Sequence, residues 1–405
     1  KTQKAFLDWR HQSLEKRANV IEAIGEKLVE YKDELSKLMT NEMGKILPQS
    51  NQEVDLCAGI CKYTAKKGVE ELKDEHRELF TGGKGIVSYS PIGIIYGIQP
   101  WNYPSYQVIR YAIVNLMAGN AVLLKHASNV TGTGLLLEKI FTEAGLPENL
   151  FKTLLISHDQ SDEVIKHKNV RGVTLTGSSD AGKNVGQKAT AELKKVVLEL
   201  GSNDAYIVLE DADIELAVEK CVQGRIYNNG ETCIAAKRFV VVDAVYDQFK
   251  DAFVKAMKDV KVGNPMDENS DMGPMAREDL RETLHEQVEE SVQKGAEILC
   301  GGKMTEGDGF YYPVTVLGNV KPGQPAYDDE LFGPVASLIK AKDEKDAMRI
   351  ANDSRFGLGG GIFSKDEEKA KNLAKDYFDT GMVFINSFGL ADPAMPFGGV
   401  KDSGF

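Results

Sequence analysis

The segment that decides the fold reads Gly172-Val173-Thr174-Leu175-Thr176-Gly177-Ser178. Its first part is a short run without polar alternation, as expected of a strand that is buried on both faces. The glycine and serine that follow end this run and lead into a helix-like stretch near residues 180–193. A buried strand that turns through glycine into a helix is typical of a parallel, doubly wound α/β sheet.

Further runs of this kind lie on both sides of the segment and alternate with helix-like stretches. They are Ile92–Ile98, Ala121–Lys125, Thr153–Ile156, Val196–Leu200 and Ala205–Leu209. Doubly wound sheets bind nucleotides at the carboxyl ends of their strands. We therefore predict an α/β protein with a Rossmann-like, doubly wound cofactor domain.

The remaining sequence predicts helices before this domain and a second α/β domain after it. Within residues 1–78, apolar residues recur every three or four positions, which indicates helices. Beyond about residue 200 we expect helices at 212–229, 246–258, 278–294 and 366–377, and strands at 238–242, 296–299, 313–317, 335–340 and 382–386. The glycine-rich segment 82–90 is expected to form a hairpin.

Size and charge narrow the class of protein. A chain of 405 residues exceeds what one hydrophobic core usually holds, so two or more domains are expected. The net charge of −12 argues against a nucleic-acid or anionic-membrane partner. No apolar run approaches the roughly 20 residues of a membrane helix, and the first residues lack the apolar core of a signal peptide. We expect a cytoplasmic protein.

The five cysteines, at positions 57, 61, 221, 233 and 300, match neither a disulfide framework nor a zinc motif, and no metal is implied. Cys233 lies in a polar break, Asn228-Asn229-Gly230-Glu231-Thr232-Cys233, after an expected helix. Such a break is able to place a thiol beside backbone N–H groups at a helix start, which favours the reactive thiolate. The alternative is a small residue in a turn.

Polar candidates follow several of the predicted strands. Glu199 ends an apolar run, where burial would raise its pKa toward that of a general base; a solvent-facing carboxylate is the alternative. Gly177 and Ser178 open a helix where phosphate is able to approach backbone N–H groups, although a tight turn fits equally well. Lys125 closes another run. Asn102 lies in a proline-flanked turn, as a donor to an oxyanion or merely as a turn former.

Seven sequence blocks, in this order and spread over nearly the whole chain, resemble the signature blocks of the aldehyde dehydrogenase superfamily. They are Pro100-Trp101-Asn102-Tyr103-Pro104, Leu124-Lys125, Thr176-Gly177-Ser178, Glu199-Leu200-Gly201, Gly230-Glu231-Thr232-Cys233, Glu330-Leu331-Phe332-Gly333-Pro334 and Pro396-Phe397-Gly398-Gly399. The segments Lys125-His126-Ala127 and Glu199–Asp213 are most similar to the bacterial NAD(P)-dependent succinate-semialdehyde dehydrogenase branch.

The resemblance implies a domain plan and an assembly. Residues 1–78 and 91–200 would form the cofactor-binding domain, 79–90 an oligomerisation hairpin and 201–398 the catalytic domain. Residues 399–405 would begin a C-terminal segment whose remainder lies outside this chain. A homodimer or homotetramer is implied.

The resemblance also implies a role for each motif residue. Cys233 matches the nucleophile, Glu199 the general base and Asn102 the oxyanion hole. The implied cofactor contacts are Trp101, Lys125, Gly177, Ser178, Glu330 at the nicotinamide ribose and Phe332 near the nicotinamide. In the implied reaction the thiolate attacks the aldehyde, the nicotinamide accepts a hydride from the thiohemiacetal, and Glu199 activates the water that hydrolyses the thioester.

Two departures from the common family pattern bear on the cofactor and the thiol. Ser128 stands three residues after Lys125, in place of a glutamate that holds the 2′-hydroxyl of NAD. A glutamate at this position would repel the 2′-phosphate of NADP, whereas serine does not and is able to donate a hydrogen bond to it. We therefore predict NADP as the cofactor, alone or alongside NAD. Glu231 replaces the usual glutamine, and a carboxylate there is expected to raise the pKa of the thiol.

One arginine, together with the branch resemblance above, supports succinate semialdehyde as the expected substrate. Arg110 lies eight residues after Asn102, where succinate-semialdehyde dehydrogenases resemble this chain in carrying a carboxylate-binding arginine. The second arginine of some of those enzymes is replaced by Tyr227, with Arg225 two residues earlier. An ordinary salt-bridging role for Arg110 is the alternative.

Other functions stay open at this point. The chain would also suit another small aliphatic or aromatic aldehyde. Glu199 argues against a CoA-acylating dehydrogenase, because transfer of the acyl group to CoA needs no hydrolytic base. The presence of Cys233, Glu199, Asn102 and Glu330 together argues against a non-catalytic structural or binding relative. A thiol protease or amidase would need a histidine partner, and the six histidines show no recognisable Cys/His arrangement.

Overall fold

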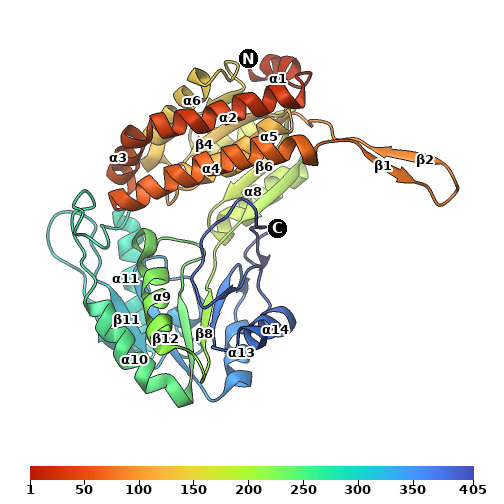
Figure 1. The fold of residues 1–405 in the computed structure, drawn as a ribbon. Helices are drawn as coiled ribbons and strands as arrows, with labels where there is room; N and C mark the ends of the chain where they lie inside the picture. Colours follow the sequence, from red (N-terminus) through yellow and green to blue (C-terminus); the bar gives the residue numbers. More distant parts are fainter. The chain divides into compact units, whose positions relative to one another are not determined.

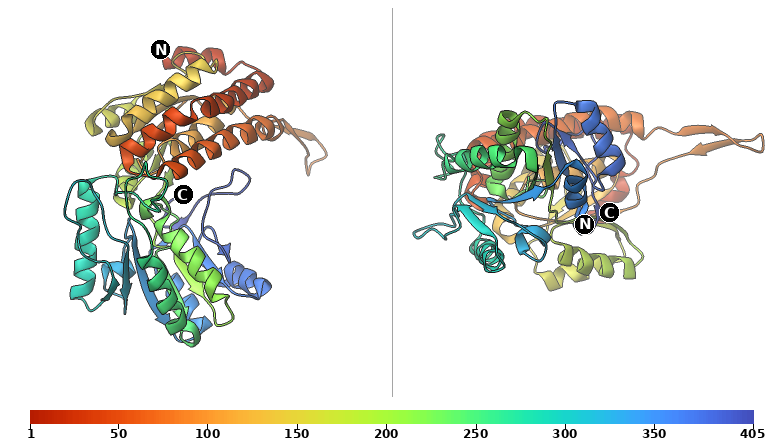
Figure 2. Two further views of the ribbon diagram at one scale, coloured as in Figure 1. Left: turned by 60° about the vertical axis from the view of Figure 1, so that its left-hand side comes forward. Right: turned by 90° about the horizontal axis from the view of Figure 1, so that it is seen from below.

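The computed structural model describes residues 1–405, which divide into two compact units (Figures 1 and 2). Unit 1 comprises Lys1–Glu42, Ser50–Leu198 and Asp392–Ala394. Unit 2 comprises Met43–Gln49, Glu199–Ala391 and Met395–Phe405. None of the helices combines the length and the apolar character that a membrane crossing needs.

A five-stranded sheet in the order β5-β4-β3-β6-β7 forms the centre of unit 1. Its strands are β3 (Ile94–Gln99), β4 (Ala121–His126), β5 (Phe151–Thr153), β6 (Val170–Thr176) and β7 (Lys195–Glu199). Strand β3 pairs in parallel with both β4 and β6, and β4 pairs in parallel with β5. The chain winds outward from β3 in one direction and from β6 in the other. The gap between these two strands is therefore the switch point at which such sheets bind ligands.

Helices pack on this sheet through apolar faces. The helices of the first 198 residues are α1 (Thr2–Trp9), α2 (Leu14–Glu30), α3 (Lys32–Met43), α4 (Leu47–Glu71), α5 (Tyr106–Met117), α6 (Thr131–Glu143), α7 (His158–Lys166) and α8 (Ser179–Ala191). In α2 the side chains of Ile21, Ile24 and Leu28 recur at helical spacing and are completely buried. Helix α5 approaches the sheet closely at Gly97 of β3, where a Cβ would lie 2.2 Å from the Tyr111 ring.

A two-stranded antiparallel hairpin, β1 (Glu75–Glu78) and β2 (Lys84–Val87), projects from unit 1 (Figure 1). Its apolar residues include the exposed Phe80 and Ile86. The first strand occupies a position where the sequence pattern predicted helix. Residues 73–78 are all charged or histidine and offer no apolar stripe for a helix to bury, which explains the difference.

Unit 2 contains a seven-stranded sheet in the order β10-β11-β12-β9-β8-β14-β15, parallel except for the antiparallel edge pair β10–β11. Its strands are β8 (Ala205–Val208), β9 (Arg238–Val242), β10 (Glu297–Cys300), β11 (Thr315–Gly318), β12 (Val335–Ala341), β14 (Gly360–Phe363) and β15 (Phe384–Ile385). A separate pair joins β13 (Phe356–Gly357) to β16 (Val400–Lys401). The helices are α9 (Ile214–Ile226), α10 (Asp243–Lys258), α11 (Glu278–Gln293), α12 (Pro325–Asp328), α13 (Glu344–Asn352) and α14 (Glu367–Tyr377).

Two apolar cores contain alternate residues of the same central strands of unit 2. Ile207 and Val240 belong to one core, whereas Val208 and Val241 belong to the other. Since successive side chains of a strand point to opposite faces, both faces of the sheet are buried. The α/β class and the doubly wound sheet predicted from the sequence are confirmed.

Candidate active site

The motif residues of unit 1 follow the carboxyl ends of the strands beside the switch point. Asn102 comes after β3, Lys125 is the second-last residue of β4, and Gly177 comes after β6. Lys125 lies opposite Ile98 in the parallel register, so the ends of these strands are level with one another. Burial lowers the pKa of Lys125. The sheet thus gathers at one edge residues that lie far apart in the sequence.

The start of α8 fits a phosphate-bearing cofactor. The Ser178 hydroxyl caps the helix by accepting a hydrogen bond from the Ala181 N–H at 3.3 Å. A Cβ added at Gly177 would come no closer than 3.9 Å to Leu175 and 4.0 Å to Ala181. The protein's own packing therefore does not require glycine at this position. Its absent side chain leaves the backbone open beside the positive end of the helix, where a pyrophosphate would bind.

The turn that carries Trp101 and Asn102, both largely buried, is fixed by His126 at the end of β4. The His126 Nε2 lies 2.9 Å from the Pro104 carbonyl oxygen, and the Ala127 N–H donates to Nδ1 at 3.1 Å. The Nδ1 also lies 3.3 Å from the Gln99 carbonyl oxygen, and a proton on Nε2 allows the Pro104 and Ala127 bonds to form together. Burial lowers the pKa of His126 to about 4, which keeps the ring in this neutral form near pH 7. Sequence reasoning missed this role.

The segment before Cys233 adopts an uncommon backbone conformation. In the turn Tyr227–Gly230, Asn228 and Asn229 have φ of 56° and 60°, and Gly230 has φ of 76°. Asparagine and glycine tolerate this left-handed region better than other residues. A Cβ at Gly230 would lie 2.5 Å from the carbonyl of Gly333, so the Cys233 segment packs directly against the backbone of the Glu330–Pro334 block.

Several hydrogen bonds hold this left-handed segment in place. The Asn229 side chain accepts from the Gly273 N–H and donates to the Pro274 carbonyl, both at 2.9 Å. The Asn228 N–H donates to the Gln49 side chain at 2.8 Å. Arg225 is completely buried and donates to the Gly230 carbonyl at 2.6 Å. Because its guanidinium is directed to backbone carbonyls, Arg225 is not the second arginine of a substrate clamp.

Cys233 is only partly buried, which is a requirement for a nucleophile. Cys57, Cys61 and Cys221 are completely buried, and burial raises the pKa of the Cys61 and Cys221 thiols. Burial also raises the pKa of Cys300, which is partly exposed. Cys233 is followed by a turn and strand β9 rather than by a helix. The helix start suggested by the sequence is therefore absent, and a helix dipole does not activate this thiol.

Glu231 also differs from the sequence-based expectation. Its side chain is buried, and its Oε1 accepts a hydrogen bond from the Ala276 N–H at 3.1 Å. Burial raises the pKa of Glu231 well above its ordinary value, although this bond, Asn229 and the charge of Lys45 oppose the shift. The protonated form is thereby favoured. A neutral carboxyl would not raise the pKa of the neighbouring thiol as an anion would.

Glu330 connects the Glu199 strand end to the Cys233 segment within unit 2. A Cβ at Gly201, two residues after Glu199, would lie 2.7 Å from the Glu330 Oε2. The other carboxylate oxygen forms a 3.0 Å ion pair with Lys237, and Lys237 donates to the Cys233 carbonyl. Glu199 itself is 8% exposed. The structure thus places Glu330 beside both segments, whereas Lys237 is a residue that the sequence did not single out.

The remaining candidates lie on both units. Ser128 is exposed in the 3-10 helix Ser128–Val130 that follows β4. Arg110 lies on α5, with its guanidinium 5.9 Å from the Tyr106 ring centroid. Phe332 is partly buried in the block that packs against Gly230. No group of three or more His, Cys, Asp or Glu residues has a metal-binding arrangement.

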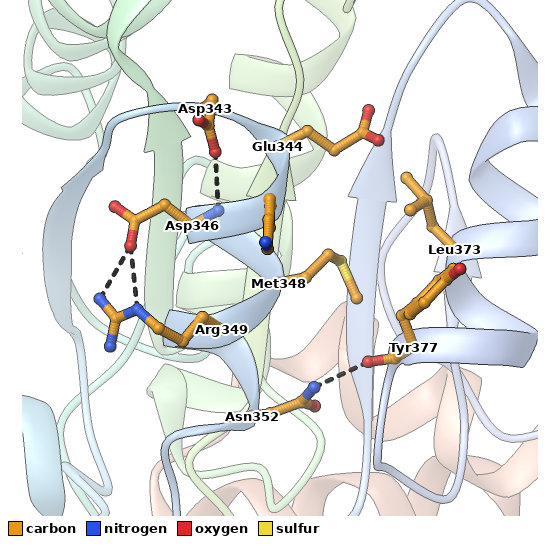
Figure 3. Close-up of a pocket in the computed structure, with 9 residues that line it drawn as sticks. Asp343, Glu344, Asp346, Met348, Arg349, Asn352, Leu373 and Tyr377 are labelled. Carbon is orange, nitrogen blue, oxygen red and sulfur yellow. Dashed lines mark hydrogen bonds and ion pairs between the residues drawn. The ribbon is translucent and has the colours of Figure 1, made fainter.

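A cavity of about 760 Å³ between α13 and α14 is separate from these residues (Figure 3). Several of its charged and polar lining groups are already paired. Arg349 forms a 2.9 Å ion pair with Asp346, and the Asn352 amide donates to the Tyr377 carbonyl at 2.7 Å. No cysteine, serine, threonine or histidine lines the cavity, so it offers no thiol or hydroxyl nucleophile with a histidine base.

The chain is similar over its whole length to proteins of known family. The sequence profile of the aldehyde dehydrogenase family matches residues 1–405. The succinate semialdehyde dehydrogenase [NAD(P)+] of Escherichia coli K12 is 44% identical over 99% of this chain and 86% of its own length. A probable succinate-semialdehyde dehydrogenase [NADP(+)] of Synechocystis is 41% identical over 100% of this chain and 88% of its own.

A solved structure is similar over the same extent. The succinic semialdehyde dehydrogenase of Streptococcus pyogenes, in complex with NADP+, has a TM-score of 0.97 and 36% identity, covering 100% of this chain and 89% of its own. Profile, sequence and fold agree along the whole chain. This protein belongs to the aldehyde dehydrogenase family.

Proposed function

We propose that this protein oxidises succinate semialdehyde to the carboxylic acid with NADP, or with NADP and NAD, through a covalent intermediate on Cys233. The observation that carries the proposal is the arrangement in unit 2, where Glu330 lies beside both the Glu199 strand end and the Cys233 segment. The family membership and the names of the similar proteins support the reaction and the substrate.

The reaction begins with attack of the Cys233 thiolate on the aldehyde carbon, which forms a carbon–sulfur bond and an oxyanion. The Asn102 amide and backbone N–H are suited to stabilise that oxyanion, since the turn around Asn102 is rigidly held. The bound dinucleotide supplies the oxidant that converts the adduct to a thioester. Glu199 then takes a proton from water, whose oxygen attacks the thioester carbon, and the thiolate leaves with release of the acid.

The cofactor residues are proposed from their positions at the strand ends. Lys125, with Ser128 at the start of the following 3-10 helix, would contact the adenosine ribose and its 2′-phosphate. The start of α8 at Gly177 and Ser178 would bind the pyrophosphate. Trp101, Glu330 and Phe332 would contact the remainder of the cofactor.

Ser128→Glu is expected to lower kcat/KM for NADP+ by about 100-fold, because two negative charges would meet in the 2′-phosphate site. Use of NAD+ should change by less than about 3-fold, since its ribose hydroxyl is uncharged. Steady-state kinetics with each cofactor at saturating aldehyde measure the ratio. Ser157→Glu, at an exposed helix cap distant in sequence, is a matched control. Equal losses with both cofactors would contradict the assignment of Ser128.

Arg110→Ala is expected to raise KM for succinate semialdehyde at least about 10-fold, since a charge-assisted, bidentate contact with the substrate carboxylate is lost. KM for propanal, which has no carboxylate, should stay within about 2-fold. Initial rates with both aldehydes give the comparison. If both KM values rise alike, Arg110 is a structural residue and the substrate carboxylate is bound elsewhere.

We further propose a cytoplasmic location, for which the sequence features given above are the support. A homodimer or homotetramer would explain the exposed apolar residues of the β1–β2 hairpin, since an isolated hairpin has no core of its own. Neither a nucleic-acid nor a membrane partner is proposed for a chain with a net charge of −12.

A further inference from the structure

Lys237 is a completely enclosed cation beside the proposed nucleophile. Its side chain is 2% exposed, although lysine is rarely buried unless it is paired. An ammonium group carries three N–H donors. Two of those of Lys237 bond to the Thr232 carbonyl, at 3.1 Å, and to the Cys233 carbonyl. The ammonium also forms an ion pair with the Glu330 Oε1 at 3.0 Å. One side chain therefore joins two consecutive carbonyls of the Cys233 segment to a carboxylate of the Glu330–Pro334 block.

The electrostatic surroundings of Lys237 are mixed in sign. Glu330 and Asp204 are the carboxyls that interact with the ammonium, and burial raises the pKa of both. Arg225 interacts with Glu330, and Arg238 with Asp204, so both carboxylates have a second cationic neighbour. Glu231, on the Cys233 segment itself, is held toward its neutral form by burial. Burial thus disfavours the ionised form of all three carboxyls.

We infer that Lys237 is a positioning residue of the reaction, whose ammonium fixes the Cys233 segment against Glu330 and supplies the positive potential that favours the Cys233 thiolate. This role replaces the helix start that Cys233 lacks, because a cation near a thiol favours its ionised form. The inference rests on the proposed function of Cys233 as nucleophile. Through Lys237, the ionisation of the Cys233 thiol would depend on Glu330, the carboxylate proposed to hold the cofactor ribose.

The test measures alkylation of Cys233 by iodoacetamide as a function of pH, in enzyme without cofactor, with the modified residue identified by mass spectrometry. Lys237→Met removes the charge and keeps the apolar stem. We expect it to move the inflection of the alkylation rate upward by about one pH unit and to slow alkylation at pH 7 by about 10-fold. Lys340→Met, at a half-exposed lysine paired with Asp243, is the matched control and should change neither value.

Glu330→Gln provides a second variant with the opposite expected sign. It removes a negative charge and leaves the ammonium in place, so the inflection should move downward. If Lys237 had a purely structural role, the pH inflections of the alkylation rate in the two variants would not shift in opposite directions. The inference is overturned if Lys237→Met leaves the inflection unchanged, or if Glu330→Gln raises it or has no effect. Should Lys237→Met fail to fold, Lys237→Gln takes its place with the same expected upward shift, since it removes the charge but keeps an N–H donor for the two carbonyls.

Failure of the inference and failure of the proposed function remain distinguishable in this design. If alkylation of Cys233 leaves turnover intact, Cys233 is not the nucleophile and the proposed function fails. The other case is that alkylation of Cys233 abolishes turnover while its pH dependence is the same in the variants at residues 237 and 330 as in the wild type. That result refutes only the role of Lys237.

Discussion

Replacing Cys233 with alanine is expected to lower kcat by at least about 10⁴-fold, because no other residue would form the covalent adduct. NADP+ should still bind with a dissociation constant within about 3-fold of the wild-type value, since the proposed cofactor contacts lie on other residues. Steady-state rates and a calorimetric titration with NADP+ give the two values. The small side chain of alanine fits the left-handed loop that precedes position 233 without straining it.

Cys300→Ala is the matched control for this loss. Cys300 is likewise partly exposed, but burial raises the pKa of its thiol and it lies on the edge strand β10. Its replacement should leave kcat within about 2-fold of wild type, as a distant surface change usually does. Substantial turnover by Cys233→Ala, or loss of turnover by Cys300→Ala, would contradict the assignment of Cys233 as the nucleophile.

Glu199→Gln is expected to separate the two halves of the reaction. Gln keeps the shape of the side chain but cannot accept a proton from water, so hydrolysis of the thioester should slow by about 10²- to 10⁴-fold. Formation of the thioester needs no such base. Rapid mixing with substrate should therefore show a burst of NADPH close to one equivalent per active site, followed by a slow steady state.

The burst amplitude distinguishes this role from simple damage to the site. A misfolded or misaligned site would lose the burst together with the steady state. Adding a good external nucleophile such as hydroxylamine should restore turnover of Glu199→Gln, because it attacks the thioester without a protein base. An unchanged steady-state rate would place the base at another residue.

The sequence predicted those strands that contain a long apolar run. Strands such as β3 and β12 have nearly continuous apolar runs, whereas β14 escapes prediction because Gly359–Gly361 reads as a loop. The structure explains these glycines by packing instead. A Cβ at Gly360 would lie 2.5 Å from the Phe378 ring, and one at Gly361 would lie 2.6 Å from the Tyr206 ring. Glycine here makes room for aromatic neighbours.

The candidate site was predictable only in part for a different reason. Cys233, Glu199 and Asn102 lie in motifs that a reader of the sequence can recognise. Lys237 and His126 act through contacts with residues far along the chain, and nothing in their immediate sequence marks those contacts. Their roles depend on which strands become neighbours, and a single sequence does not show that.

The left-handed turn at Asn228, Asn229 and Gly230 determines when the Cys233 segment loses its conformational freedom. A flexible nucleophile would have to be immobilised anew each time an aldehyde arrived, which would add to the barrier of every catalytic cycle. Here the side-chain and backbone hydrogen bonds around the turn immobilise it when the chain folds. In the proposed reaction, substrate would meet a thiol on a segment that is already ordered, so the loss of freedom would belong to folding rather than to turnover.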